Sequence, residues 1–308
     1  MLYQKIVLAG GSGYLGTVLA GYYRSRAKEV IILSRKPRPD DGNISTVVWD
    51  ARTTGSWLKC LEGADMLINL CGKNVNCRYT PENKKAIVLS RTVPTRLLGE
   101  AIALLQQPPQ LWINVTSATI YRHAEDRPQD ELTGETGYGF SVDVCNGWEE
   151  SFWQCATPAT RKVALRMGIV LGRRDGAFPR LLNLVKMGFG GRQGNGSQYI
   201  GWVHEQDAAR ATEWLLQHPA LSGIFNCTAP GGITNSAFMR LLRETYGIRA
   251  GLPLPQWLLE TGARLAGTET ELLLKSRWVY PRLLEQAGFR FAYADAAHAV
   301  HDLLATVA

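Results

Sequence analysis

Residues 5–16 read KIVLAGGSGYLG, an apolar run that breaks into closely spaced glycines. The run Ile6–Leu8 is typical of a central parallel strand that is covered on both faces. Glycine has no Cβ, so the glycines that follow permit a tight turn, a close approach of backbone N–H groups to a pyrophosphate and close packing of the next helix. We therefore expect a strand, a phosphate-binding turn and a helix over residues 14–23 whose N-terminus faces the phosphates.

The spacing of these glycines matches dinucleotide-binding patterns. Positions 11, 13 and 16 fit G-x-G-x-x-G, and positions 10, 13 and 16 fit a wider variant of it. A glycine-rich turn that binds nothing is the alternative, but a second strand at residues 29–33 supplies the βαβ context of a nucleotide site. The residues predicted to contact the cofactor here are Gly10, Gly11, Ser12, Gly13, Tyr14, Leu15 and Gly16.

The end of the second predicted strand indicates which dinucleotide is bound. An NAD site usually places an acid there to accept hydrogen bonds from the ribose, whereas the 2′-phosphate of NADP needs cations. The strand ends in Ser34, Arg35 and Lys36, and the next acids, at positions 40 and 41, lie beyond two prolines. Arginine holds phosphate as a planar fork and lysine as a point charge. These residues predict NADP rather than NAD, with a solvated basic turn as the alternative.

Two further strands are expected to end beside the cofactor. Ligands of open α/β sheets lie beyond the carboxyl ends of the strands. A strand over residues 44–49 ends at Asp50, and a strand that begins at residue 66 ends in Leu70, Cys71 and Gly72. We expect the last three residues to pass beneath the cofactor, and Cys71 can at the same time be a small buried apolar residue.

A helix is predicted to begin at Pro81, because Thr80 is a good N-cap and proline is favoured in the first turn of a helix. Pro94 predicts a kink or a restart of this helix. Arg91 lies on the same helix, where it either extends into solvent or directs a cation at the phosphates.

The composition indicates one large α/β domain, alone or with a smaller lobe. The chain has 308 residues, 45% of them hydrophobic, and a formal net charge of +7. No apolar run approaches the roughly 20 residues that cross a bilayer, and a strand begins at once, which leaves no room for a cleavable signal. The six cysteines form no C-x-x-C pair and the five histidines show no metal-ligand spacing. We expect reduced thiols, a cytoplasmic location, no metal, no membrane and, because the basic residues are distributed, no nucleic-acid partner.

The ordered motifs together resemble the extended short-chain dehydrogenase/reductase superfamily. They are the glycine turn, Ser34–Lys36, Asn69–Gly72, SATIY at 117–121, RMGIVLG at 166–172, and WVH at 202–204 with Asp207. More narrowly, the chain is similar to the atypical "epimerase family protein" group, whose members are described as NAD-dependent epimerase/dehydratases or nucleoside-diphosphate-sugar epimerases. The resemblance covers nearly the whole chain. It implies a Rossmann-type doubly wound parallel sheet with a smaller, mainly helical C-terminal lobe.

The resemblance also implies which residues touch NADP and which act on a substrate. The matching cofactor positions are Ser34, Arg35, Leu70, Cys71, Arg91 and Val170. Ser117 matches a substrate-orienting serine, and the alternative for it is a hydroxyl that satisfies the backbone at a strand end. Tyr121 matches another residue of the pattern, and the alternative for it is a packing role beneath a loop. Ser117 and Tyr121 are therefore the catalytic candidates.

One departure from the superfamily concerns catalysis. Its enzymes use Tyr-x-x-x-Lys, in which the tyrosine exchanges a proton with the substrate while the lysine holds the nicotinamide ribose and lowers the pKa of the tyrosine. Counting back from Trp148 and Glu149, these two positions fall near Ser141 and Cys145. Serine is too weak an acid or base without help, and cysteine supplies no cation. The sequence therefore predicts the cofactor without identifying the proton donor.

We expect residues 1–172 to form the NADP-binding domain, with residues 198–230 returning to it, and residues 173–197 and 231–308 to form a smaller substrate lobe. Two functions are compatible with these features. The first is an NADP-dependent oxidoreductase or nucleotide-sugar epimerase, a monomer or homodimer that acts on a nucleotide sugar or another carbonyl compound. The second is a non-catalytic NADP-binding regulator, for example of cell division, that acts through a protein partner.

Overall fold

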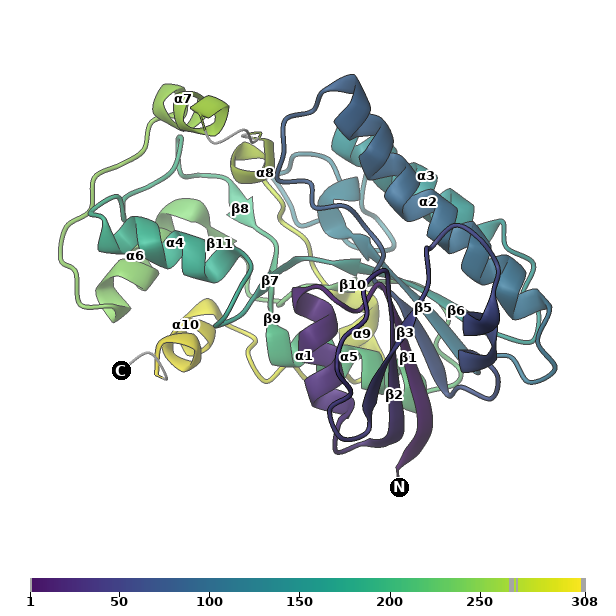
Figure 1. Ribbon diagram of the computed structural model, residues 1–308. Helices are drawn as coiled ribbons and strands as arrows, with labels where there is room; N and C mark the ends of the chain where they lie inside the picture. The colour runs from purple at the N-terminus through teal and green to yellow at the C-terminus, as the bar shows by residue number, and fades with distance from the viewer. Residues whose placement is uncertain (1, 266–268, 270, 306–308) are drawn as a thin grey trace.

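A seven-stranded sheet forms the centre of the molecule (Figure 1). The computed structural model describes residues 2–265, 269 and 271–305. The strands of this sheet are β1 (Tyr3–Ala9), β2 (Ala27–Ser34), β3 (Ile44–Val48), β4 (Met66–Asn69), β5 (Leu111–Ser117), β6 (Arg161–Met167) and β10 (Gly223–Cys227). Their order is β10-β6-β5-β4-β1-β2-β3, and every neighbouring pair is parallel. The expected Rossmann-type doubly wound sheet is confirmed.

Different helices cover the two faces of the sheet. The helices are α1 (Tyr14–Tyr23) and α5 (Glu205–Gln217) on one face, and α2 (Pro81–Ala103) and α3 (Phe140–Trp153) on the other. Ile6 and Leu8 pack in the core with α1 and α5, whereas Val7 packs in the core with α2 and α3. All three side chains are fully buried. Because both faces are covered, the strand is apolar without alternation.

The order of the strands creates a crevice between β1 and β4. β2 and β3 lie on one side of this pair, and β5, β6 and β10 lie on the other. The connections that leave β1 and β4 therefore diverge, which opens a crevice beyond the carboxyl ends of these strands. The glycine turn follows β1 and residues 70–72 follow β4, so the fold brings these two predicted segments together.

Residues 161–171 form two strands, which are separated at Gly168. Only β6 belongs to the main sheet, because the following β7 (Ile169–Leu171) pairs with β9 (Trp202–His204). A Cβ on Gly168 would lie 2.8 Å from the carbonyl oxygen of Gly201, so two backbones cross closely at this point. The chain leaves the main sheet here, which a continuous apolar pattern does not reveal.

Helix α2 begins at Pro81, and the side chain of Thr80 caps its first turn as expected. A kink or a restart was expected at Pro94; the helix continues through this residue, which excludes the restart. Pro94 itself is buried, and the buried Leu97 and Leu98 that follow it pack in the core beneath α2. Tertiary packing of this face favours one continuous helix across the proline.

A second core lies beside the main domain. It contains side chains from three helices: α4 (Ala177–Lys186), α6 (Asn235–Thr245) and α10 (Ala296–Leu304). The remaining elements of the chain are the short helices η1 (Ser56–Cys60) and η2 (Ala118–Ile120), the strands β8 (Tyr199–Ile200) and β11 (Ile233–Thr234), and the helices α7 (Gln256–Leu265), α8 (Glu271–Leu274) and α9 (Arg282–Gln286). No helix within the described ranges is long and apolar enough to span a membrane.

The expected domain boundaries differ from the structure in two places. Of residues 198–230, α5 and β10 belong to the main domain, whereas β8 and β9 pair outside it with β11 and β7. Leu284 on α9 and the nearby Phe289 pack in the core of the main sheet, although residues 231–308 were expected in the smaller lobe. The chain thus crosses between the two cores more often than the sequence indicates.

Candidate functional site

The turn after β1 places glycines where a side chain would not fit. Gly10 has a φ of 72°, and a Cβ there would lie 2.8 Å from the Sγ of Cys71. A Cβ on Gly16 would lie 2.2 Å from the carbonyl oxygen of Gly11, so α1 packs directly on the turn. At Gly13, by contrast, no neighbouring heavy atom lies within 4 Å of the Cβ position. The turn is closely packed at Gly10 and Gly16 and open at Gly13, where a ligand can approach the backbone.

The start of α1 has unused hydrogen-bond donors. Gly13 caps the helix without a side-chain hydrogen bond, and the first turn contains no acidic residue. In the described part of the chain, the backbone N–H groups of residues 12–16 have no acceptor. Such N–H groups carry partial positive charge and bind anions. The turn therefore meets the physical requirements of a phosphate site.

A cleft of about 1020 Å³ opens beside this turn, beyond the ends of β1 and β4. Many of its lining residues were predicted from the sequence: Gly10, Ser12, Arg35, Asp50, Leu70, Cys71 and Gly72. Others were missed, and they come from the turn after β3, the loop after β4 and α2: Arg52, Lys73, Asn74, Glu82, Lys85 and Ser90. No motif marks these residues, and three of them, Glu82, Lys85 and Ser90, lie on α2 and reach the cleft only through the packing of that helix.

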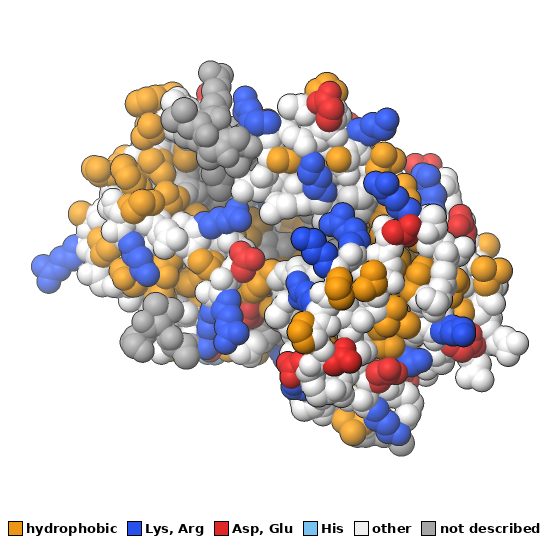
Figure 2. Space-filling view, in the orientation of Figure 1, with side chains coloured by type: hydrophobic (Ala, Val, Ile, Leu, Met, Phe, Trp, Pro, Cys, Tyr) orange, Lys and Arg blue, Asp and Glu red, His pale blue; other side chains and the backbone are white. Residues whose placement is uncertain are grey.

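Cations surround the mouth of the cleft, and Figure 2 shows Lys and Arg side chains gathered around a hollow near the centre of the view. The exposed Arg35 lines the cleft and makes no hydrogen bond or ion pair with another described residue. Arg38, which sequence reasoning missed, donates from Nη2 to the carbonyl oxygen of Ser12 at 2.7 Å. Lys36 is exposed outside the cleft, and its N–H donates to the Oγ of the buried Ser34 at 3.2 Å. Arg35 is therefore the cation of this strand end that faces the cleft.

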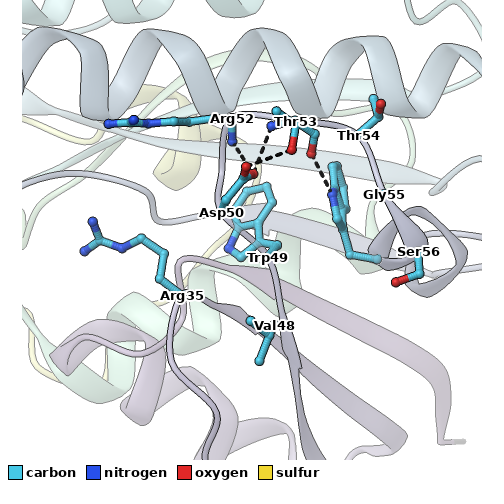
Figure 3. Close-up of a pocket in the computed structure, with 10 residues that line it drawn as sticks. Arg35, Val48, Trp49, Asp50, Arg52, Thr53, Thr54, Gly55 and Ser56 are labelled. Atoms are coloured by element: carbon cyan, nitrogen blue, oxygen red, sulfur yellow. Dashed lines mark hydrogen bonds between the residues drawn. The ribbon is translucent and has the colours of Figure 1, made fainter.

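Asp50 organises the turn after β3 (Figure 3). Its carboxylate accepts hydrogen bonds from the N–H of Thr53 at 2.9 Å, the N–H of Arg52 at 2.8 Å and the hydroxyl of Thr53 at 2.7 Å. These bonds lower the pKa of Asp50 to about 2. Ala51 has a φ of 61°, which residues with a Cβ rarely adopt. The turn borders a further hollow of about 650 Å³ that Arg35 also lines, and Figure 3 shows Arg35 and Arg52 extending to the same side.

Three predicted cofactor residues have side chains that pack or bond inside the protein: Cys71 is buried, and Tyr14 and Leu15 are half-buried. Burial raises the pKa of Cys71 to about 12, so its thiol is a small apolar group beneath the cleft. The hydroxyl of Tyr14 donates to Glu205 on α5, and Leu15 packs against the core of the main sheet. Tyr14 and Leu15 can therefore reach a ligand through their backbone N–H groups.

Arg91 lies behind Gly72, outside the lining of the large cleft. The Cβ position of Gly72 is 3.1 Å from the guanidinium carbon of Arg91, and Nη1 donates to the carbonyl oxygen of Lys73 at 3.2 Å. The same carbon lies 5.1 Å from the ring centroid of Trp148. Arg91 thus forms the wall between the cleft and a smaller cavity. Val170, on β7, lines neither the large cleft, nor the hollow beside Asp50, nor the smaller cavity.

The smaller cavity, of about 100 Å³, lies at the carboxyl end of β5. Ser117 lines it, together with Ser141 and Cys145 on α3, the two residues at the expected tyrosine and lysine positions. Burial raises the pKa of Cys145 to about 11, so this thiol stays neutral near pH 7. Tyr79, which lines the cavity from the loop after β4, was missed because that loop carries no motif. The cavity therefore contains one phenol and several hydroxyl groups.

Tyr121, the other catalytic candidate, does not line the smaller cavity. It is 3% exposed and lines none of the three cavities described above. Its hydroxyl donates to Oδ1 of Asn226 at 3.0 Å and accepts from Nη1 of Arg166 at 2.9 Å. Arg166 forms an ion pair with Glu149 at 2.8 Å. The placement of Tyr121 corresponds to its packing alternative, inside a buried polar network.

Comparisons with known proteins agree with this geometry. Residues 6–228 match the NAD dependent epimerase/dehydratase family. The chain belongs to this family. Residues 254–303 match a domain of unknown function, DUF1731.

Relatives within the epimerase/dehydratase family cover almost the whole chain. The epimerase family protein SDR39U1 of Bos taurus is 32% identical over 306 residues, which are 98% of this chain and 100% of the relative. The crystal structure of human SDR39U1 with NADPH has a TM-score of 0.86 and 29% identity, and the match covers 97% of this chain and 99% of that chain. A nucleoside-diphosphate sugar epimerase from Corynebacterium glutamicum has a TM-score of 0.77 and 27% identity, over 98% of this chain and 59% of the other. The resemblance predicted from the motifs is confirmed.

The two matched regions meet at the smaller cavity. The epimerase/dehydratase region contains the glycine turn, Arg35 and Ser117, whereas the second region contains α8. Ser141 in the first region donates from Oγ to Oε2 of Glu271 in the second at 3.0 Å. The C-terminal region therefore contributes a side chain to the neighbourhood of the catalytic positions.

Proposed function

We propose that this chain binds NADP(H) in the cleft at β1 and β4 and uses it as an oxidoreductase or nucleotide-sugar epimerase. The observation that carries the proposal is the set of unpaired N–H groups over residues 12–16 beside the uncommitted guanidinium of Arg35. N–H groups at a helix start suit a pyrophosphate, and an arginine fork suits a 2′-phosphate. The crystal structure of human SDR39U1 with NADPH supports the same cofactor.

Each part of the site has a defined task in this proposal. The backbone of the glycine turn holds the pyrophosphate, and Arg35 holds the 2′-phosphate. Leu70 and Gly72 form the floor of the cleft. Ser117 lines the smaller cavity, where its hydroxyl can orient a carbonyl group. When bound, NADPH would supply a hydride and NADP⁺ would accept one, and the substrate is a nucleotide sugar or another carbonyl compound.

Titration calorimetry with NADPH and NADH tests the cofactor assignment. Arg35→Glu removes a charge-assisted hydrogen bond worth about 1.5–3 kcal/mol, so NADPH should bind roughly 10- to 150-fold more weakly at about 1.4 kcal/mol per tenfold change. The affinity for NADH, which lacks the phosphate, should not fall. Arg240→Glu, at an exposed position on α6, is the matched control and should bind NADPH as the unaltered chain does. Equal affinities of the unaltered chain for NADPH and NADH would refute the assignment.

A second function is favoured by one observation: serine and cysteine stand at positions 141 and 145, where the superfamily has tyrosine and lysine. On this basis the chain would be a non-catalytic regulator whose bound NADP organises a surface for a protein partner. Cells that lack the chain can be complemented with Ser117→Ala or with Arg35→Glu, and their growth and division recorded. Rescue by Ser117→Ala but not by Arg35→Glu favours the regulator, whereas failure of Ser117→Ala favours the enzyme.

A further inference from the structure

The smaller cavity offers few groups that could exchange a proton with a substrate. Among the residues that line it, Tyr79, Arg91 and Cys145 carry ionisable side chains. Arginine stays protonated in proteins and cannot act as a base. Cys145 is 3% exposed, and burial raises its pKa to about 11. Tyr79 is the remaining group, and a phenol is also the group that the superfamily uses at this step.

Tyr79 stands next to the position where the expected tyrosine is missing. Its hydroxyl oxygen lies 3.5 Å from Oγ of Ser141, and its ring packs edge-on against Phe140 with 4.8 Å between centroids. Its backbone N–H donates to Oε1 of Glu269 at 3.0 Å. The loop after β4 thus supplies the phenol that α3 lacks at position 141.

A chain of oxygen atoms leads from Tyr79 out of the cavity. Ser141 lies between Tyr79 and Glu271, and it donates to Oε2 of Glu271 at 3.0 Å. Ser141 is 9% exposed, whereas Glu271 is partly exposed and can exchange protons with water. The three groups come from three separate segments: the loop after β4, helix α3 and helix α8.

A cation lies near Tyr79, although no lysine is present at position 145. The guanidinium of Arg91 lies in the wall of the cavity, close enough to interact electrostatically with Tyr79 and Cys145. It is held there by the carbonyl oxygen of Lys73 and the ring of Trp148. Arg91 can therefore stabilise negative charge that develops on the Tyr79 oxygen, which is one task of the superfamily's lysine.

We propose that Tyr79 is the proton donor and acceptor of this site, with Ser141 and Glu271 as positioning residues that pass its proton to and from solvent. The inference rests on the proposed oxidoreductase function. In reduction, hydride addition to the carbonyl carbon breaks the C=O π bond, and its electron pair takes the proton of the Tyr79 hydroxyl. To restore Tyr79, the Glu271 carboxylate takes a proton from solvent and passes it to Ser141, which gives its own hydroxyl proton to Tyr79. In oxidation each proton moves the opposite way, from Tyr79 through Ser141 to the Glu271 carboxylate, which releases it to water.

The electrostatics of Tyr79 agree with this assignment. Burial raises the pKa of Tyr79, and the nearby carboxylate of Glu271 raises it further. The resting phenol is consequently protonated near pH 7 and ready to donate.

Two measurements on Tyr79→Phe, Ser141→Ala and Glu271→Gln test the proposal. The first is NADPH oxidation with phenanthrenequinone and with UDP-sugars as carbonyl probes. Tyr79→Phe should lower kcat by roughly 100-fold or more, the usual worth of a general acid, while the Kd for NADPH stays within about 2-fold. Ser141→Ala should lower kcat and Ser141→Thr, which keeps the hydroxyl, should restore it. Tyr246→Phe, on the surface of the smaller lobe, is the matched control and should behave as the unaltered chain.

The second measurement is an ultraviolet titration of tyrosinate, which needs no substrate. The difference between the unaltered chain and Tyr79→Phe isolates the titration of Tyr79. In Glu271→Gln this titration should move to lower pH, because a negative charge that opposes ionisation is removed. An unchanged titration in Glu271→Gln, or full kcat in Tyr79→Phe, would overturn the inference while the proposed function stands. No turnover of any probe by the unaltered chain would instead refute the oxidoreductase function, and this inference with it.

Discussion

The replacement Tyr121→Phe separates a structural from a catalytic role for a residue that the family pattern singles out. The hydroxyl of Tyr121 donates to Oδ1 of Asn226 and accepts from Nη1 of Arg166, and the side chain is 3% exposed. Phenylalanine keeps the ring but leaves both partners without this bond. A buried polar group that loses its partner costs about 1–3 kcal/mol. Two such groups predict a decrease of roughly 2–6 kcal/mol in the free energy of unfolding.

Urea unfolding measures this decrease, and calorimetry with NADPH measures the cofactor site in the same variant. We expect the midpoint of unfolding to fall while the Kd for NADPH, measured well below that midpoint, stays unchanged. Tyr246→Phe is again the matched control, since Tyr246 is 38% exposed and its hydroxyl bonds to no described residue. Unchanged stability together with lost NADPH oxidation would show that Tyr121 is catalytic and that the structural reasoning is wrong.

Three further predictions concern the cleft. Gly16→Ala should abolish NADPH binding and lower the thermal midpoint, because its Cβ would lie 2.2 Å from the carbonyl oxygen of Gly11; retained affinity in calorimetry would contradict the close packing. The pKa of Asp50 is lowered from 3.8 to about 2, so its stabilising effect is present above pH 3.8 and is lost as the pH falls through 2; acid unfolding of Asp50→Asn should lack this part of the pH dependence, and identical acid curves would argue against it. Cys71 should resist iodoacetamide in the folded chain, since burial raises its pKa to about 12, whereas the half-buried Cys77 should react first; peptide mass spectrometry would expose the opposite order.

The sequence alone predicted the parts of the site that a single segment builds. The apolar run and the glycines of residues 5–16 predicted β1, the turn and the full extent of α1, because burial and backbone freedom are local properties of those residues. The same reasoning placed Arg35 at the mouth of the cleft and Thr80 at the start of α2.

Only the tertiary structure decided where segments distant in the sequence meet. The bond between Ser141 and Glu271 spans 130 positions, and the bond between Tyr121 and Asn226 spans 105. A local pattern states whether a residue is buried or helical, but not which distant group it will face. The sequence therefore determined the strand and the phosphate-binding turn of residues 5–16. The packing of the loop after β4, α3 and α8 decided which groups surround the smaller cavity.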